Sequence, residues 1–437
     1  MLGRLMGRSL VLCLTIAMIG CSGSKTEIPL SSPTIPFSAT PPEPSVTFTV
    51  TPSIIPPTFT PFPPTSTPEI PDATVCESGC SFQSVQAAVD ALGYSGPVII
   101  EIVSPEHTEG GIIVREGQSV IIRGLGPEQT VLQAHETLAG STDRVILIEK
   151  GGEAVLQGLT IRHGRPAVEE EHGGGVNTFG KLTIINCLIT ENSARGGGGV
   201  SAREADLTIL SSTIEGNTAR GDGPRGLECG GGGGVKCSSG TMTLMNSAVV
   251  NNTAGLKAEG LGGGVRVGCG CQADIINTTV ANNQAVRYGS GIAAGGEVQI
   301  IHATLVGNKV KQTDGGALWI RGNTTLINSL IADNSGGLDC VIHIEGLYGG
   351  VLVENSNNLI TDGSCDPDYS GEAKLDALGD HGGLTVTIPL MPDSPAVDAV
   401  PLADCLIAYD QRGEHRSLVL FRPESPCDIG AFELQMP

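Results

Sequence analysis

The chain has 437 residues, of which 46 are acidic and 25 are Lys or Arg, so its formal net charge is −21 at pH 7. This charge disfavours a nucleic acid or an anionic membrane surface as the partner. Only 3% of the residues are aromatic and 62 are glycine, whereas a globular core of this length normally uses more aromatic side chains. We therefore expect a thin interior made of stacked aliphatic columns.

The first 21 residues have the pattern of a targeting segment. Arg4 and Arg8 precede an apolar run, residues 10–19, that is too short to span a bilayer core of about 30 Å. The run ends in MIGC (residues 18–21), which resembles the lipobox of bacterial lipoproteins, with Met in place of the commoner Leu. The resemblance implies a lipoprotein-type signal peptide over residues 1–21. An ordinary secretory signal with an incidental cysteine is the alternative.

The lipobox also implies how the chain is anchored. Cys21 is expected to become the lipidated N-terminus of an exported bacterial lipoprotein at the cell surface, which contacts the membrane only through this lipid. Residues 22–72 contain 14 of the 27 prolines, interleaved with Thr and Ser. Such a segment cannot bury a core, so we expect a disordered, extended tether with a reach on the order of 150 Å.

A helix is predicted near the start of the folded part, which begins near Ala73. In SFQSVQAAVDALG (residues 81–93), Ser81 or Ser84 is expected to be the N-cap and Gly93 the stop. One face of this helix is apolar and contains Val85, Ala88, Val89 and Leu92. A helix here would cover a strand edge that is otherwise exposed at the start of the fold.

A phrase of Asn, a glycine run and an aliphatic residue recurs through the middle of the chain. Its asparagines lie 25 to 35 residues apart, at Asn192, Asn217, Asn252, Asn283, Asn308 and Asn334. A period of this size indicates one supersecondary unit stacked on copies of itself. The units contain short β-branched runs broken by Gly and Asn, and no helix-length apolar stripe. The sequence therefore predicts a parallel β-helix over residues 73–336.

Coils that stack about 4.8 Å apart place equivalent residues over one another. One internal aliphatic column is expected to contain Ile184, Ile209, Leu244, Ile275, Ile300 and Leu326, and another Ile189, Ile214, Val249, Val280, Leu305 and Ile331. A polar column at a turn would contain Asn186, Ser211, Asn246, Asn277, His302 and Asn328. We expect left-handed backbone angles in this column and in the Asn192 column. The glycines supply positive φ at sharp turns. The run at residues 230–234 lacks the context of a phosphate-binding loop.

The cysteines suit an oxidising compartment. Of the 13, Cys13 lies in the signal peptide, Cys21 is the lipidation site, and Cys187 is expected to pack unpaired beside the aliphatic columns. The other ten form local pairs, which are hypotheses because connectivity does not follow from sequence. The pairs are Cys76–Cys80, Cys229–Cys237, Cys269–Cys271, Cys340–Cys365 and Cys405–Cys427. Zinc bound by Cys229, Cys237, Cys269 and Cys271 is a disfavoured alternative, because the spacings match no standard finger.

The repeat resembles the right-handed β-helix repeats of pectate-lyase-like proteins and polymorphic outer-membrane proteins, which share the GG-aliphatic and Asn signatures. The C-terminal part is similar to the choice-of-anchor Q domain of secreted bacterial β-helix proteins. This similarity lies in NLITDGSC (358–365), LGDHGGLTVTIPLMPDSPAVDA (378–399), DQRG (410–413) and CDIGAFE (427–433). An insertion, EHRSLVLFRPESP, departs from that family. The resemblance implies an all-β, right-handed fold, with residues 337–437 as final coils and a C-terminal cap.

Lyases of the pectate-lyase-like fold use an Arg or Lys base, usually beside a calcium site of several acids. The position after the GG-aliphatic turn is occupied by Asn177, Ser201, Lys236, Arg266, Ala293 and Trp319, so Lys236 and Arg266 are expected to stack on adjacent coils. Arg203 and Arg321 lie two residues further along in their own coils. These four cations are the candidate binding residues, and Lys236 and Arg266 are the catalytic candidates. The favoured interpretation is that Lys236 and Arg266 solvate an outer face.

No aligned column of acids accompanies these cations. The densest acidic group is Glu169, Glu170 and Glu171 beside His172, within one turn. Calcium is therefore not supported, and we expect no metal or cofactor. A second charged group lies in the terminal segment and contains Asp398, Asp410, Arg412, Arg416 and Asp428. The family resemblance implies that these residues form ion pairs and turns that close the last coil, not an acid/base site.

Two functions remain open. The favoured one is a surface-tethered, non-catalytic β-helix that binds a polysaccharide or cell-surface glycan, or serves as a structural module. The alternative is a polysaccharide lyase or glycoside hydrolase, which needs a groove where a base meets several carboxylates or where two acids face each other. Two adjacent coils are lengthened at residues 221–229 and 255–260. Insertions at one point of a repeat emerge on one side of the solenoid, often its binding side.

Overall fold

The chain divides into two compact units, Met1–Phe62 and Pro63–Pro437. The computed structural model describes residues 69–167, 172–221, 230–255, 260–313, 315–344, 349–416 and 426–435. The expected signal peptide and most of the expected tether lie outside these ranges. No helix in the described ranges is long and apolar enough to cross a membrane.

The predicted helix is confirmed and covers the first strands. Helix α1 (Val85–Leu92) begins after Ser84, whose side chain accepts a hydrogen bond from the Ala87 N–H, and it ends at Gly93. Its buried residues are Val85, Ala88 and Val89. The Glu109 carboxylate accepts hydrogen bonds from the first free N–H groups, those of Val85 and Gln86. A negative charge is favourable there because the N-terminus of a helix carries a partial positive charge.

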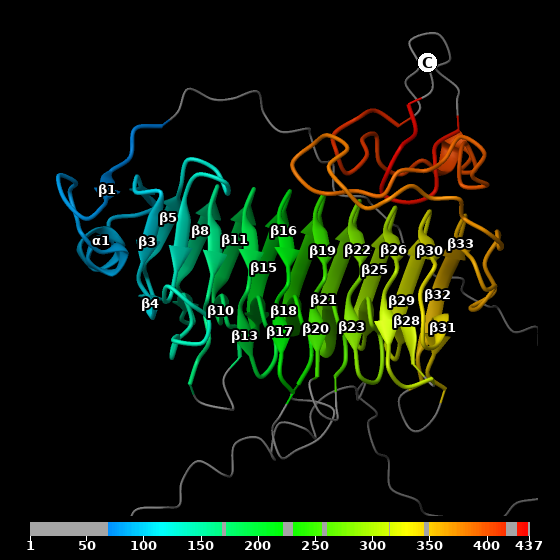
Figure 1. The fold of residues 1–437 in the computed structure, drawn as a ribbon, viewed down its shortest axis with the longest axis horizontal. Coiled ribbons are helices and arrows are strands. Elements are labelled where there is room, and N and C mark those ends of the chain that lie inside the picture. Colours follow the sequence, from blue (N-terminus) through cyan, green and yellow to red (C-terminus); the bar gives the residue numbers. More distant parts are fainter. Residues whose placement is uncertain are drawn as a thin grey trace, which may run out of the picture. The chain divides into compact units, whose positions relative to one another are not determined.

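The rest of the fold is a stack of coils that builds three parallel sheets (Figure 1). The second sheet has one strand from each of ten coils: β3 (Glu106–Thr108), β6 (Val131–Gln133), β9 (Thr160–Arg162), β12 (Leu188–Thr190), β16 (Thr213–Glu215), β19 (Ala248–Val250), β22 (Thr279–Ala281), β26 (Thr304–Val306), β30 (Leu330–Ala332) and β33 (Leu359–Ile360). The third sheet contains β13 (Ser193–Ala194), β17 (Thr218–Ala219), β20 (Thr253–Ala254), β23 (Gln284–Ala285) and β27 (Lys309–Val310).

The first sheet has 18 strands in two rows, because most coils contribute two strands to it. The A1 row contains β4 (Ile112–Val114), β7 (Ile146–Ile148), β10 (Val176–Thr178), β14 (Val200–Ala202), β24 (Ile292–Ala294), β28 (Gly316–Ile320) and β31 (Leu338–Ile342). The A2 row contains β1 (Ala73–Val75), β2 (Val98–Ile102), β5 (Ser119–Arg123), β8 (Glu153–Gln157), β11 (Lys181–Ile185), β15 (Ala205–Leu210), β25 (Glu297–Ile301), β29 (Asn323–Ile327) and β32 (Val351–Ser356). Strands β18 (Val235–Met245) and β21 (Val265–Ile276) run through both rows.

Both predicted aliphatic columns are confirmed by the strand register. The Ile184 column runs in register from β11 to β29, and the Ile189 column runs in register from β12 to β30. All members of both columns are fully buried and belong to one continuous core. The hydrophobic effect therefore acts along the whole stack, because each coil covers the apolar side chains of its neighbours.

The predicted polar turn column also has left-handed backbone angles, from φ 46° at Ser211 to φ 52° at Asn328. The Asn192 column behaves differently from the prediction. The residue before each of its asparagines takes the positive φ, for example Asn251 at 58° before Asn252. The asparagines themselves form a buried hydrogen-bonded ladder. In each step, the side-chain oxygen of one Asn accepts from the backbone and side-chain amides of the Asn one coil earlier, as Asn252 does from Asn217 at 2.9 and 3.1 Å.

The glycine run is needed for close packing as well as for turning. The first glycine of the run has positive φ, as at Gly197 (60°) and Gly232 (68°). Two positions later, a Cβ at Gly199 would lie 2.9 Å from the Gly234 carbonyl oxygen and 3.1 Å from the Asn217 side chain. Glycine at this position therefore leaves more room for the asparagine ladder.

Four disulfides join described cysteines. Three join the pairs hypothesised from sequence, Cys76–Cys80, Cys340–Cys365 and Cys405–Cys427. The fourth joins Cys237 to Cys271, so the hypothesised pairs Cys229–Cys237 and Cys269–Cys271 are wrong. These two cysteines are 34 residues apart but lie on β18 and β21, which are neighbours in the stack. In the described ranges Cys187 is unpaired and buried, Cys269 is unpaired and exposed, and Cys229 lies outside them.

The C-terminal segment folds back along the flank of the coils, over the second sheet (Figure 1). Ile388 packs on Ala248, Val250 and Ala281 of β19 and β22, while Leu390 and Ile429 pack with Leu330 of β30. These outward-facing residues of the second sheet are apolar and need a cover. The expectation that the charged residues of this segment close the last coil is therefore wrong.

We expect Asn252→Ala to lower the free energy of unfolding by roughly 3 kcal/mol or more. Without this side chain the Asn217 N–H and the Ile214 and Val250 carbonyls lose buried hydrogen bonds, each worth about 1–3 kcal/mol when left unmade. Urea unfolding measures the effect, with exposed Asn323→Ala of β29 as the control. Equal stability of the two variants would contradict a stabilising ladder.

Candidate functional site

Lys236 and Arg266 occupy matching positions on neighbouring coils, as predicted. Lys236 of β18 is opposite Arg266 of β21, and the column continues through Ala293 and Trp319. Towards the N-terminal coils, the column continues from Lys236 through Ser201 and Asn177. We call these residues the A1 outer column, because Val235 and Cys237, on either side of Lys236, belong to the core and alternate residues of a strand point to opposite faces.

The burial of the A1 outer column differs from the expectation. Lys236 is only 4% exposed, so the interpretation that it solvates an outer face is wrong. Arg266 is half-buried, and its guanidinium donates a hydrogen bond to the Gly230 carbonyl. Arg203 is exposed and Arg321 is half-buried, and both lie in the turns that follow the A1 row. Arg203 is therefore the most accessible of the four predicted binding residues.

Cations from two neighbouring coils gather around His172. Burial, followed by the charges of Lys236, Arg195 and Arg203, lowers the pKa of His172 to about 2. Its Nδ1 lies 3.3 Å from the Gly196 carbonyl oxygen. The imidazole is therefore neutral near pH 7, and the positive charge of this region belongs to the Lys and Arg side chains. The acidic group Glu169, Glu170 and Glu171 lies outside the described residues.

Aromatic side chains continue this face beyond Arg266. Tyr288 stacks on Trp319 with ring centroids 4.8 Å apart and planes within 7° of parallel. The Arg287 guanidinium lies 5.0 Å from the Tyr288 ring centroid, an arrangement that favours a cation–π interaction. Trp319 is buried with Leu261 and Ala293, whereas Tyr288 is half-buried at the surface of this cluster. The face therefore changes from cationic to aromatic along the stack.

A shallow cavity of about 210 Å³ lies on the A2 row of the same coils. It is lined by Thr241, Met242, Thr243, Gln272, Ala273, Asp274, Glu297 and Gln299. Burial and the nearby negative charge of Glu297 raise the pKa of Asp274. The Gln272 side chain donates a hydrogen bond of 3.0 Å to Glu297. Two carboxylates in different environments thus share one cavity.

Sequence reasoning missed this acid pair because its members do not share a column. Asp274 is opposite Gln299, and Glu297 is opposite Gln272, so the acids are diagonal neighbours on successive coils. Aligning the strands that contain Ile275 and Ile300 would have revealed the acid pair. That alignment places Glu297 two residues before Gln299, which is the residue opposite Asp274. In the part of the chain that the structure describes, no group of three or more His, Cys, Asp or Glu side chains could bind a metal ion.

Two strands connect the cationic column to the row that contains the acid pair. Strands β18 and β21 run through both rows, and the Cys237–Cys271 disulfide joins these two strands between the rows. The unpaired, exposed Cys269 lies beside it. The insertions predicted to flank this face, residues 221–229 and 255–260, lie mostly outside the described residues.

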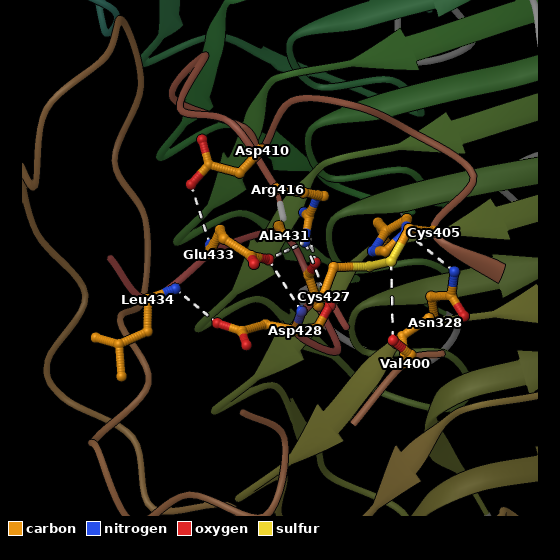
Figure 2. A network of polar contacts seen from close by, with 12 residues as sticks. Asn328, Val400, Cys405, Asp410, Arg416, Cys427, Asp428, Ala431, Glu433 and Leu434 are labelled. Carbon is orange, nitrogen blue, oxygen red and sulfur yellow. Dashed lines mark hydrogen bonds and ion pairs between the residues drawn. A yellow bond between two sulfur atoms is a disulfide. The ribbon is translucent and has the colours of Figure 1, made fainter. Parts of the chain in front are cut away.

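The terminal charged residues hold the C-terminal segment against the coils (Figure 2). Fully buried Arg416 donates to the Asn277 amide oxygen at 3.0 Å, to the Gly430 carbonyl at 2.7 Å and to Glu433 at 3.2 Å. Arg412 pairs with Asp410 at 2.7 Å. The ion pairs of Arg412 with Asp410 and of Arg416 with Glu433 lie within the segment, as was predicted from the sequence for these charged residues.

Asp428 lies at the centre of this network. It accepts hydrogen bonds from the Asp398 and Leu434 N–H groups at 2.8 and 2.6 Å. Burial nevertheless raises its pKa to about 6, with the Asp398 charge acting in the same direction. The charge of Asp428 is therefore a source of instability in the neutral range.

Comparison with known proteins supports the fold. The family model described as "Right handed beta helix region" matches residues 144–332. The chain is a right-handed parallel β-helix. Among solved structures, the crystal structure of Escherichia coli YbhC is similar, with 14% identity and a TM-score of 0.36 over 72% of this chain and 86% of that chain. None of the curated proteins compared with the chain matches it.

We expect the C-terminal segment to be more stable at pH 4.5 than at pH 7.5. A carboxyl whose pKa is raised to about 6 stabilises the fold when protonated, and this contribution is lost as the pH rises through 6. The loss is on the order of 2 kcal/mol. Urea unfolding at both pH values should show that Asp428→Asn removes this part of the pH dependence, whereas exposed Asp404→Asn preserves it. An unchanged dependence in Asp428→Asn would contradict the assignment.

Proposed function

We propose that the chain is an exported bacterial lipoprotein, anchored through Cys21, whose β-helix binds an anionic polysaccharide or cell-surface glycan without cleaving it. The observation that carries the proposal is the gathering of Arg195, Arg203 and Lys236 around His172, next to Arg266, on a chain of net charge −21. Cations concentrated against the overall charge attract an anionic ligand to one face.

The neighbouring aromatic residues support a sugar as this ligand. Tyr288 is half-buried and backed by Trp319, so its ring is held in one orientation at the surface. A rigid aromatic ring offers a large contact area at a low cost in conformational entropy, and its hydroxyl can bond to polar groups. A face with cations followed by an aromatic ring matches a ligand with carboxylate or sulfate groups and apolar ring faces.

The terminal segments complete the proposal. Residues 22–72 act as a tether that holds the β-helix away from the membrane. The C-terminal segment acts as a choice-of-anchor Q-like cap that covers the apolar outer face of the second sheet. The repeats correspond to those of the pectate-lyase-like and polymorphic outer-membrane proteins. In this proposal the cap and the tether display the β-helix, and the cationic region around His172 binds the ligand through its exposed residue Arg203.

We expect a fragment from Pro63 to bind uronate-containing or sulfated glycans on an array. The fragment must keep Glu69 and Asp72, because their oxygens accept hydrogen bonds from Arg123 and Ile99. Arg203→Ala should weaken binding about tenfold, since a hydrogen bond to a charged group contributes roughly 1.5–3 kcal/mol. Exposed Lys309→Ala on the third sheet is the matched control. Equal losses in both variants would indicate attraction by overall charge only.

A polysaccharide hydrolase is the second candidate, and the acid pair Asp274 and Glu297 favours it. Glycosidases pair a protonated acid of raised pKa with an ionised carboxylate. Burial and the Glu297 charge raise the pKa of Asp274, which suits the acid role. A lyase would instead use Lys236 or Arg266 as the base.

If the chain is a hydrolase, incubation with pectin, alginate and glycosaminoglycan panels should release new reducing ends. Asp274→Asn and Glu297→Gln should each reduce the rate by a factor of roughly 100 or more, because general acid–base catalysis contributes about 10²–10⁴-fold. Exposed Asp404→Asn in the C-terminal segment should not affect the rate. Unsaturated products lost in Lys236→Ala or Arg266→Ala would indicate a lyase, and the absence of products would favour the binding function.

A further inference from the structure

Strands β31 and β32 lie at the end of the β-helix opposite α1 (Figure 1). Apolar side chains are exposed there. Leu338 of β31 is 53% exposed, and Ile344, shortly after that strand, is 82% exposed. Val351 and Val353 of β32 are 49% and 51% exposed. Leu338, Val351 and Val353 lie on the two last strands of the first sheet, and Ile344 follows the first of these strands. No coil within the described residues covers them.

An open strand edge accompanies the apolar residues. Strand β32 pairs with β29 on one side, and no other described strand pairs with it. An unpaired edge presents N–H and C=O groups that can accept another strand. The edge is limited to residues 351–354, because the Asn355 side chain bonds to the Cys365 and Asp366 carbonyls and the Asn357 N–H bonds to Asp368.

The neighbouring edges at this end are occupied. The Asp339 and Cys340 N–H groups of β31 donate to the Asp362 and Ser364 side chains at 2.8 and 2.9 Å. In the second sheet, β33 forms a parallel bridge to Tyr369. Within the described residues, β31 and β33 therefore have partners on their outer edges, whereas residues 351–354 of β32, where the register is irregular at Val353, have none.

The segment that contains this edge is acidic, although Arg321 lies beside the start of β32. Between Arg321 and Lys374 the sequence contains no Lys or Arg and eight acids, which are Asp333, Asp339, Glu345, Glu354, Asp362, Asp366, Asp368 and Glu372. Asp362, Asp366 and Asp368 are exposed. A second copy of the chain would bring like charges together at this edge. A basic partner would gain from the same field.

We propose that residues 351–354 of β32 accept an extended segment of another polypeptide in which apolar residues alternate with Lys or Arg. Main-chain hydrogen bonds to β32 would provide a strand-addition geometry. Apolar side chains of the added strand would cover Val351 and Val353, and its cations would face the Asp362, Asp366 and Asp368 carboxylates. The partner is recognised by its strand geometry and its charge pattern together.

The test uses the full-length chain and a fluorescent octapeptide of alternating Val and Lys. Fluorescence anisotropy should show saturable binding that weakens as salt rises. The Val351→Lys and Val353→Lys variants should each bind about tenfold more weakly, which corresponds to the burial of one valine side chain. Leu384→Lys and Met391→Lys change exposed apolar residues of the C-terminal segment and are the matched controls.

A second peptide separates strand addition from simple charge attraction. An octapeptide of the same sequence with alternate backbone amides N-methylated keeps its charge and side chains but lacks the N–H donors of one edge. It should bind at least about tenfold more weakly, because several main-chain hydrogen bonds of about 1 kcal/mol each are removed. Equal affinity of the two peptides would overturn the proposal. Sedimentation that shows a dimer abolished by Val353→Lys would also overturn it, because a second copy would then be the occupant.

Discussion

The asparagine ladder is the interaction on which the rest of the fold depends. Each buried Asn binds the preceding coil twice, as Asn283 does when its side-chain amide donates to the Val249 carbonyl and its side-chain oxygen accepts from the Asn252 N–H. A buried amide that loses its partners is costly, so a slip of one coil against the next would leave several polar groups unsatisfied. The ladder therefore fixes the register of neighbouring coils, and the aliphatic columns follow from that register. The glycine runs are the consequence, because the ladder occupies the space that a Cβ would need at positions such as Gly199.

Features that repeat with the coils could be predicted from the sequence. Both aliphatic columns and the left-handed turn column were predicted residue by residue, because one alignment of the repeats determines all of them. The Cys237–Cys271 disulfide was missed, although the same alignment places these two cysteines on neighbouring coils. Proximity along the chain suggested Cys229–Cys237, but in a solenoid the nearest neighbours lie one coil away and not a few residues away. Cys237 is opposite Val267 in the register, and an irregularity after Cys237 shifts Cys271 to the position opposite Gly240.

Features without a period could not be predicted in the same way. Whether Lys236 is exposed depends on which residues cover the outer face. The position of Lys236 in the aligned repeats does not predict that. The fold-back of the C-terminal segment is a similar case. Its hydrogen bonds join residues more than 100 positions apart, such as Gln411 to Thr279 and Arg416 to Asn277. The apolar outward residues of β19 and β22, Ala248, Val250 and Ala281, indicate that the second sheet needs a cover, which an argument from the inward columns alone overlooks.

The distribution of charge along the stack connects the scaffold to its surface chemistry. Coils in a β-helix stay about 4.8 Å apart, so a side chain cannot move away from its equivalents on neighbouring coils. Like charges in adjacent positions of one column therefore repel, as Lys236 and Arg266 do, whereas the acids of the A2 row are separated from each other. Lys236 and Arg266 occupy the A1 outer column, whereas Asp274 and Glu297 lie diagonally on the A2 row, where Gln272 and Gln299 separate them along each column. The last coil has acids only, and its Asp362 carboxylate is used by the Asp339 N–H and by Ser364. Because the repeat itself imposes no charge, each of these departures from it needs a separate physical reason, and the recognition proposed above would supply one for the cations near His172 and for the acidic end.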